Sequence, residues 1–162
     1  MKLIIKLLGI LLSGLIISCG FHLRGGDTGR LPSIYIEGGN PQLGIRQEIE
    51  HMLRNLGKSP APTRDQAEII LQINQEAYQR PPLSISRQLL VQEYELIYTI
   101  NFQVSDTSGK IISQPQSLTF TRDYSFADTN QILGKTNEEN LLRQEMLVDG
   151  ARQILAQLLS GR

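Results

Sequence analysis

Residues 93–104 read Glu93-Tyr94-Glu95-Leu96-Ile97-Tyr98-Thr99-Ile100-Asn101-Phe102-Gln103-Val104, and this stretch decides the fold class. Apolar and polar residues alternate along it, so successive side chains point to opposite sides of an extended backbone. Such a long alternation is typical of a β-strand with one face in a core. The predicted core side holds Leu90, Tyr94, Leu96, Tyr98, Ile100, Phe102 and Val104, and the predicted polar side holds Glu93, Glu95, Thr99, Asn101 and Gln103.

Three other segments have strand patterns. Residues 33–37 form a short candidate strand that ends at Gly38-Gly39. In the second segment the apolar residues are Ala67, Ile69, Leu71 and Ile73, which alternate with Glu68, Gln72 and Asn74. After a turn at residues 106–109, the third segment places Leu118, Phe120, Tyr124 and Phe126 on one face and Thr119, Thr121, Asp123 and Ser125 on the other. The segment 79–87 contains two prolines, and we expect it to interrupt the sheet.

Two segments have helical spacing. In the first, Asn40 is the predicted N-cap and Pro41 the first helical residue, and Gly57 is the predicted stop. Its apolar positions are Ile45, Ile49, Met52, Leu53 and Leu56. The second opens with a predicted capping box of Thr136 and Glu139. Its apolar stripe is Leu141, Leu147, Val148, Ala151, Ile154, Leu155 and Leu158.

The predicted order is strand, helix, three strands, helix. It favours the α+β class, with a mostly antiparallel four-stranded sheet covered on one face by two helices. The other face of the sheet is polar and rich in threonine, which is the usual character of a solvated face.

The N-terminus predicts export. Lys2 and Lys6 flank an apolar run that is shorter than the roughly 20 residues of a membrane-spanning helix. The run ends at Ser18, directly before Cys19, which is the only cysteine in the chain. This junction resembles the lipobox of bacterial lipoproteins, which implies cleavage before Cys19 and its modification by N-palmitoyl and S-diacylglycerol groups. Gly20 after the cysteine fits export to the outer membrane in such lipoproteins.

The predicted organisation is therefore a signal peptide (1–18), a lipidated tether (19–32) and a single α+β domain (33–162). Cleavage after residue 18 of 162 leaves 144 residues, with 14 basic and 16 acidic side chains. A net charge of about −2 gives no basic field for nucleic acid.

Motifs for catalysis or cofactors are weak. His22 and His51 have no neighbours at metal-ligand spacing, so we expect no metal site. The run Gly134-Lys135-Thr136 resembles the end of a phosphate-binding loop, but Thr129 stands where that loop needs glycine. We expect neither a cofactor nor enzymatic activity.

The chain resembles the LptE family of lipopolysaccharide-assembly lipoproteins. The resemblance lies in the run Cys19-Gly20-Phe21-His22-Leu23-Arg24, in residues 93–101, and in residues 133–139. It implies an outer-membrane plug inside the LptD β-barrel, in a one-to-one complex, that contacts lipopolysaccharide.

The resemblance also implies two binding residues. Arg87, expected in the loop before the long strand, and Lys135, expected in the loop before the last helix, match basic positions that contact lipopolysaccharide in the family. Arginine and lysine both bind phosphate well. The sequence Gln88-Leu89-Leu90 departs from the family, which often has a polar turn with glycine there.

Two other classes of protein stay open. One is a periplasmic ligand-binding or scaffolding lipoprotein that acts without a barrel partner, and the other is a lipid-anchored hydrolase. The role of residues 21–24 is also open.

Overall fold

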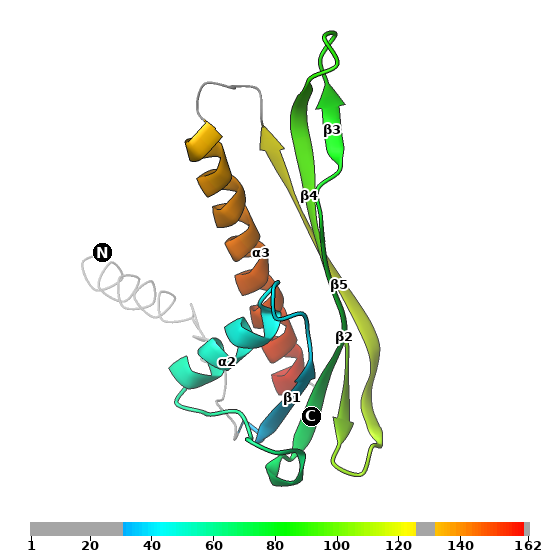
Figure 1. Cartoon of the computed structure of the whole chain (residues 1–162). Coiled ribbons are helices and arrows are strands. Elements are labelled where there is room, and N and C mark those ends of the chain that lie inside the picture. The colour runs from blue at the N-terminus through cyan, green and yellow to red at the C-terminus, as the bar shows by residue number, and fades with distance from the viewer. Residues whose placement is uncertain (1–30, 126–131, 161–162) are drawn as a thin grey trace, which may run out of the picture. The chain divides into compact units, whose positions relative to one another are not determined.

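The computed structural model describes the backbone of residues 31–125 and 132–160, with side chains for 31–125 and 137–159. These residues belong to one folded unit that begins at Leu31. Its elements, in chain order, are β1 (Ile34–Gly38), α2 (Ile45–Asn55), the short 3-10 helix η2 (Arg64–Gln66), β2 (Ile69–Gln79), β3 (Pro82–Ile85), β4 (Val91–Asp106), β5 (Ile111–Ser125) and α3 (Ile132–Ser160) (Figure 1).

The long strand β4 is the centre of the sheet. β5 pairs with it along one edge, while β2 and β3 share the other edge, all antiparallel. β1 lies beyond β2 and is parallel to it. The α+β class and the mostly antiparallel sheet are thus confirmed, but the predicted count of four strands is wrong because the sheet has five. The sequence pattern misses β3 because Pro81 and Pro82 suggest an interruption, but Pro82 is the first residue of the strand, where a missing N–H is tolerated.

One face of the sheet forms the core. Both helices lie on this side, with α3 running along the sheet (Figure 1). The predicted core side of β4 is confirmed from Leu96 to Val104, whereas Leu90 lies before the strand and is 60% exposed. The core residues include Ile34, Ile36, Ile45, Ile49, Leu53, Leu71, Ile73, Leu96, Tyr98, Ile100, Phe102, Val104, Leu118, Tyr124, Met146, Leu147, Ala151, Ile154, Leu155 and Leu158. Phe126 lies outside the described residues.

A β-bulge redirects the second half of β2. The pairing with β4 shifts between Ile73 and Gln75, so Asn74 is an extra residue in β2. Side chains after the bulge therefore reverse their alternation, and Glu76 points to the same side as Ile73. This places a carboxylate on the helix-covered face.

Glu76 explains why α2 begins later than predicted. Its carboxylate accepts the main-chain N–H of Asn40 at 2.8 Å and that of Ile45 at 3.0 Å. Asn40 accepts the N–H of Gln42 at 3.0 Å in a local turn, so it does not cap the helix directly. The helix starts at Ile45, after Gly44, and not at Pro41. Its predicted end is confirmed at Gly57, which has a φ of 72°.

The last helix also differs from its prediction. α3 begins at Ile132, so Thr136 lies inside it and is not its N-cap. Leu141 of the predicted stripe is exposed, and Met146 is buried in the core instead. Among the described residues, neither α3 nor any other helix has the length and apolarity needed to cross a membrane.

Candidate functional site

The hairpin of β3 and β4 carries Arg87 at its turn. The main-chain N–H of Ser86 donates to the carbonyl of Leu90 at 2.8 Å, and that of Leu89 donates to the carbonyl of Ser86 at 3.0 Å. The expected position of Arg87 in the loop before the long strand is therefore confirmed, and its side chain is exposed. The hairpin extends past the first turn of α3 at one end of the domain (Figure 1).

Lys135 lies in the first turn of α3, not in a loop before it. The expectation was wrong because it took Thr136 as the start of the helix. Its side chain is outside the described part of the structure, as are all atoms of Cys19 and His22. Lipidation of Cys19 and lipopolysaccharide contact by Arg87 and Lys135 stay predictions.

A polar cluster fixes the start of α3 to the sheet. Glu139 of α3 accepts the hydroxyl hydrogen of Tyr78 at 3.0 Å and a guanidinium hydrogen of Arg80 at 2.6 Å. The Arg80 guanidinium also lies 4.5 Å from the centre of the Tyr94 ring. Burial and the hydrogen bond to Glu139 raise the pKa of Tyr78 to about 12. The positive charge of Arg80 is therefore balanced by Glu139 within the domain.

The sequence patterns did not reveal this cluster. Tyr78 reaches the helix side only because the bulge at Asn74 reverses the alternation of β2. Glu139 was expected to complete a capping box, but it bonds across to β2 instead. The one sequence feature that points to this cluster is the presence of Tyr78 and Arg80 just beyond the predicted end of the second strand.

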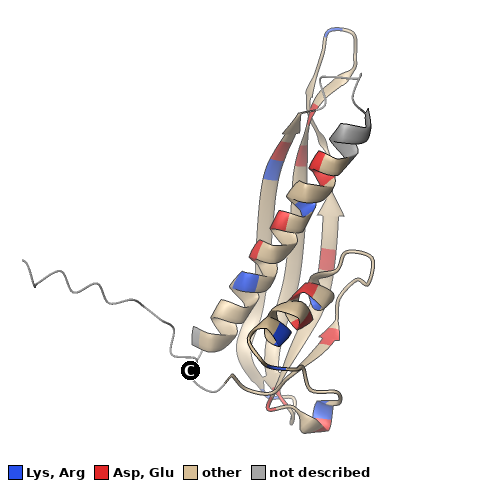
Figure 2. Cartoon of the chain, turned by 90° about the vertical axis from the view of Figure 1, so that its left-hand side faces the viewer, with Lys and Arg blue, Asp and Glu red and all other residues tan. Residues whose placement is uncertain are grey.

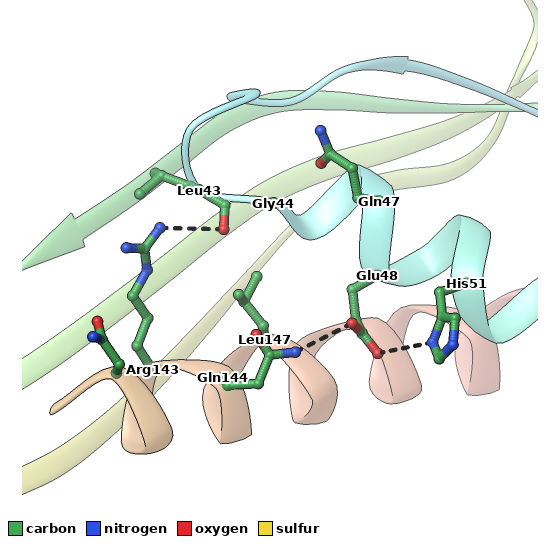
Figure 3. Close-up of a pocket in the computed structure, with 9 residues that line it drawn as sticks. Leu43, Gly44, Gln47, Glu48, His51, Arg143, Gln144 and Leu147 are labelled. Carbon is green, nitrogen blue, oxygen red and sulfur yellow. Dashed lines mark hydrogen bonds and ion pairs between the residues drawn. The ribbon is translucent and has the colours of Figure 1, made fainter. Parts of the chain in front are cut away.

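A cleft of about 480 Å³ lies between α2 and α3 (Figure 3). Arg143 of α3 donates to the carbonyl of Gln42 at 2.8 Å, and its guanidinium lies 5.5 Å from the centre of the Tyr78 ring. Gln144 donates to Glu48 at 3.3 Å, and His51 is 3.8 Å from the same carboxylate. The Gln144–Glu48 contact therefore joins α3 to α2, and Arg143 joins α3 to the segment before α2, whereas His51 and Glu48 both belong to α2.

The described side chains contain no group of three or more histidine, cysteine, aspartate or glutamate residues placed to hold a metal ion. His51 has one acidic neighbour, Glu48, and is exposed.

The sheet face opposite the helices is polar, as predicted. Asn101 donates to Gln75 at 2.8 Å, and Gln103 donates to Gln72 at 2.7 Å. Across the middle of β2, β4 and β5 this face carries no charged residue, and we call it the uncharged face. It comprises Gln72, Gln75, Ala77, Gln79, Ile97, Thr99, Asn101, Gln103, Ser117, Thr119 and Thr121. Figure 2 shows the charged residues lying mainly along the two helices and towards the ends of the strands.

Solved structures of lipoproteins share this fold. Lipoprotein B from Nitrosomonas europaea matches with a TM-score of 0.68 and 27% identity, over 78% of this chain and 81% of that one. The rare lipoprotein B from Shewanella oneidensis matches with a TM-score of 0.63 and 28% identity, over 78% of this chain and 93% of that one. A minor lipoprotein from Acinetobacter baumannii, 22% identical, has the same fold with a TM-score of 0.63, over 80% of this chain and 91% of that one.

Sequence comparison identifies the protein family. The LPS-assembly lipoprotein LptE of Pectobacterium atrosepticum is 26% identical over 145 residues, which are 88% of this chain and 77% of the relative. The family model described as "LptE: Lipopolysaccharide-assembly" matches residues 31–158, almost the whole of the folded unit. The chain therefore belongs to the LptE family of lipopolysaccharide-assembly lipoproteins.

Proposed function

We propose that this protein is a non-catalytic outer-membrane lipoprotein that plugs the LptD β-barrel and helps it assemble. In this proposal it contacts lipopolysaccharide during insertion into the outer leaflet. The lipid on Cys19 holds it to the outer membrane, where the domain faces the periplasm and the barrel lumen. Family membership supports this proposal, since the Pectobacterium relative is a lipopolysaccharide-assembly lipoprotein.

The uncharged face is the observation that carries the plug proposal. Charged residues make up about 25% of a typical soluble domain. The uncharged face has none, yet it is dense in amides and hydroxyls, such as the pairs Asn101–Gln75 and Gln103–Gln72. The interior wall of an outer-membrane barrel is polar. A surface of neutral donors and acceptors can hydrogen-bond to such a wall without desolvating a charge, which would cost far more.

A comparison of the arginine side chains near the sheet supports contact with lipopolysaccharide through Arg87. Arg80 is paired with Glu139 at 2.6 Å, and Arg122 with Asp149 at 2.9 Å. Within the described residues, no hydrogen bond or ion pair engages the Arg87 side chain. Its guanidinium is thus available for a phosphate, to which it can donate two parallel hydrogen bonds. Lys135, in the first turn of α3, would supply a second positive charge.

A substitution on the uncharged face tests whether this face contacts the barrel. Thr119→Lys places an ammonium group at an exposed position of β5, and Gln153→Lys adds the same charge at an exposed position of α3. We expect Thr119→Lys to reduce the amount of barrel that co-purifies about tenfold, because a charge loses water at the contact. Gln153→Lys should have little effect. Equal recovery of the barrel with both variants would show that this face is not the contact.

A lipoprotein that works without a barrel would behave differently. The wild-type protein would then be recovered alone, and Thr119→Lys would change nothing that co-purifies.

A further inference from the structure

The tip of the β3–β4 hairpin exposes an unusual amount of apolar surface. Leu83 is 50% exposed, Ile85 57%, Leu89 85% and Leu90 60%. These four aliphatic side chains lie within eight residues of sequence, on one hairpin. We call them the apolar tip. A compact set of exposed aliphatic groups marks a site of interaction, whereas single exposed ones are ordinary.

The backbone at Leu89 gives a second, independent sign. The turn contains three residues, Arg87, Gln88 and Leu89, closed by the hydrogen bond between Ser86 and Leu90. A turn of this length ends with a residue in the left-handed conformation, usually glycine. Leu89 occupies that position with a φ of 62°, the only non-glycine residue with positive φ in the described part of the chain.

Leucine is therefore unfavourable here in two ways. Its backbone conformation is strained, and its side chain is almost wholly in water. Glycine would relieve both costs. Strained residues of this kind cluster at active sites, ligand-binding sites and switch regions.

Arg87 defines the chemistry of that contact. It stands in the same turn as Leu89, and no described acidic group pairs with it. Glu93, which pairs with Ser84 across the hairpin, accepts a hydrogen bond from that serine at 2.8 Å. A free guanidinium beside four aliphatic side chains is complementary to an anionic amphiphile, in which a phosphate adjoins hydrocarbon chains. A groove on a protein would satisfy the apolar tip but would need its own acidic group for Arg87.

We propose that the apolar tip contacts the acyl chains of the same lipopolysaccharide molecule whose phosphate Arg87 binds in the proposed function. This inference rests on the proposed function and adds to it the part of the lipid that is recognised. The hairpin reaches beyond α3 (Figure 1), so acyl chains can approach the tip without displacing the core.

Photocrosslinking in the full-length lipidated protein tests the contact. Benzoylphenylalanine replaces Leu90 in one sample and Leu56 in another, produced in the protein's own cells. Leu56 is a matched control because it is 50% exposed but lies just after α2, outside the hairpin. The proposal predicts a lipopolysaccharide adduct at position 90 with the new bond on an acyl chain, and none at position 56. An adduct with a protein, with a phospholipid or with the sugar part alone would overturn it, as would no adduct.

Two substitutions give a quantitative readout. Burial of one leucine side chain changes an affinity by about tenfold or more. We therefore expect Leu89→Gly and Leu90→Asn each to reduce the lipopolysaccharide that co-purifies about tenfold, and Leu56→Asn to leave it unchanged. An undiminished amount with both tip variants would contradict the proposal.

The photocrosslinking samples and the wild-type sample together distinguish failure of this inference from failure of the plug proposal. If the barrel co-purifies but no acyl adduct forms at position 90, the inference fails alone. If the barrel is absent from the wild-type sample, the plug proposal fails, and the adduct at position 90 still decides the inference.

Discussion

Tyr98 of β4 donates its hydroxyl hydrogen to Glu76 of β2, with 2.5 Å between the two oxygens. The same carboxylate accepts the N–H of Ile45 at the start of α2. One side chain thus links two strands and a helix on the core face. The bulge at Asn74, which turns Glu76 to this face, determines where the first helix begins.

Removal of this carboxylate should destabilise the domain. Glu76→Ala leaves the Tyr98 hydroxyl and the N–H groups of Asn40 and Ile45 without their acceptor, and each unsatisfied group costs about 1–3 kcal/mol when buried. Because the site is partly buried, we expect a loss of about 3 kcal/mol in the free energy of unfolding. Urea denaturation measures it. Gln75→Ala, on the exposed side of the same strand, is the control and should cost under about 1 kcal/mol.

A glycine pair tests the backbone of β1. Gly38 has a φ of 79°, and a Cβ there would overlap the carbonyl oxygen of Ile73. Gly57 has a φ of 72° but no atom within 4 Å of an added Cβ. Gly57→Ala should therefore cost only the left-handed strain, about 1 kcal/mol, and Gly38→Ala clearly more. Similar unfolding midpoints for the two variants would contradict the close approach of β1 to β2.

The domain should lose stability at high pH. The pKa of Tyr78 is raised from its ordinary value of 10.0 to about 12, first by burial and then by the hydrogen bond to Glu139. A raised pKa means that the protonated phenol stabilises the fold fully below pH 10, and that this stabilisation is lost between pH 10 and 12. Urea midpoints measured across this range should fall.

Tyr78→Phe is the control for this titration. It should make the decline shallower without abolishing it, since the pKa values of Tyr98 and Tyr124 are also raised. An unchanged slope would exclude Tyr78 as a contributor.

Leu89→Gly should stabilise the isolated protein. Glycine adopts the left-handed conformation without the penalty of about 1 kcal/mol that leucine incurs. We expect a higher urea midpoint together with weaker lipid binding. A lower midpoint would mean that Leu89 contributes to the fold, and the strain argument would fail.

Charge reversal tests the two predicted binding residues. Arg87→Asp and Lys135→Asp should each weaken lipopolysaccharide binding about tenfold or more, because a charge-assisted hydrogen bond contributes about 1.5–3 kcal/mol. Lys58→Asp, exposed in the loop after α2, makes the same change in net charge. An equal effect of Lys58→Asp would point to general repulsion and not to a site.

The fold class followed from the sequence because the alternation in β4 is long and unbroken from Leu96 to Val104. The errors occurred where a contact distant in sequence overrides local preference. Glu76 replaces Asn40 as the cap of α2, and Glu139 bonds to Tyr78 of β2 and to Arg80, which follows that strand. Neither contact could be seen without knowing that β2 continues past its bulge.

The candidate site was only partly predictable. The loop position of Arg87 followed from the resemblance to the LptE family, and the interruption of the apolar pattern at residues 79–87 agrees with it. That Leu89 and Leu90 would be exposed was not predicted; Leu90 fits the core side of β4 by spacing alone. The hairpin turn, in which Leu89 has a positive φ, places Leu90 before the strand and outside its core face.

The most direct test of the central claim is the stoichiometry of the tagged, lipidated wild-type protein purified in detergent from its own outer membrane. Quantitative mass spectrometry identifies what co-purifies. The proposal predicts one large β-barrel of the LptD type for each copy of this chain. Recovery of the protein as a solitary monomer would contradict it.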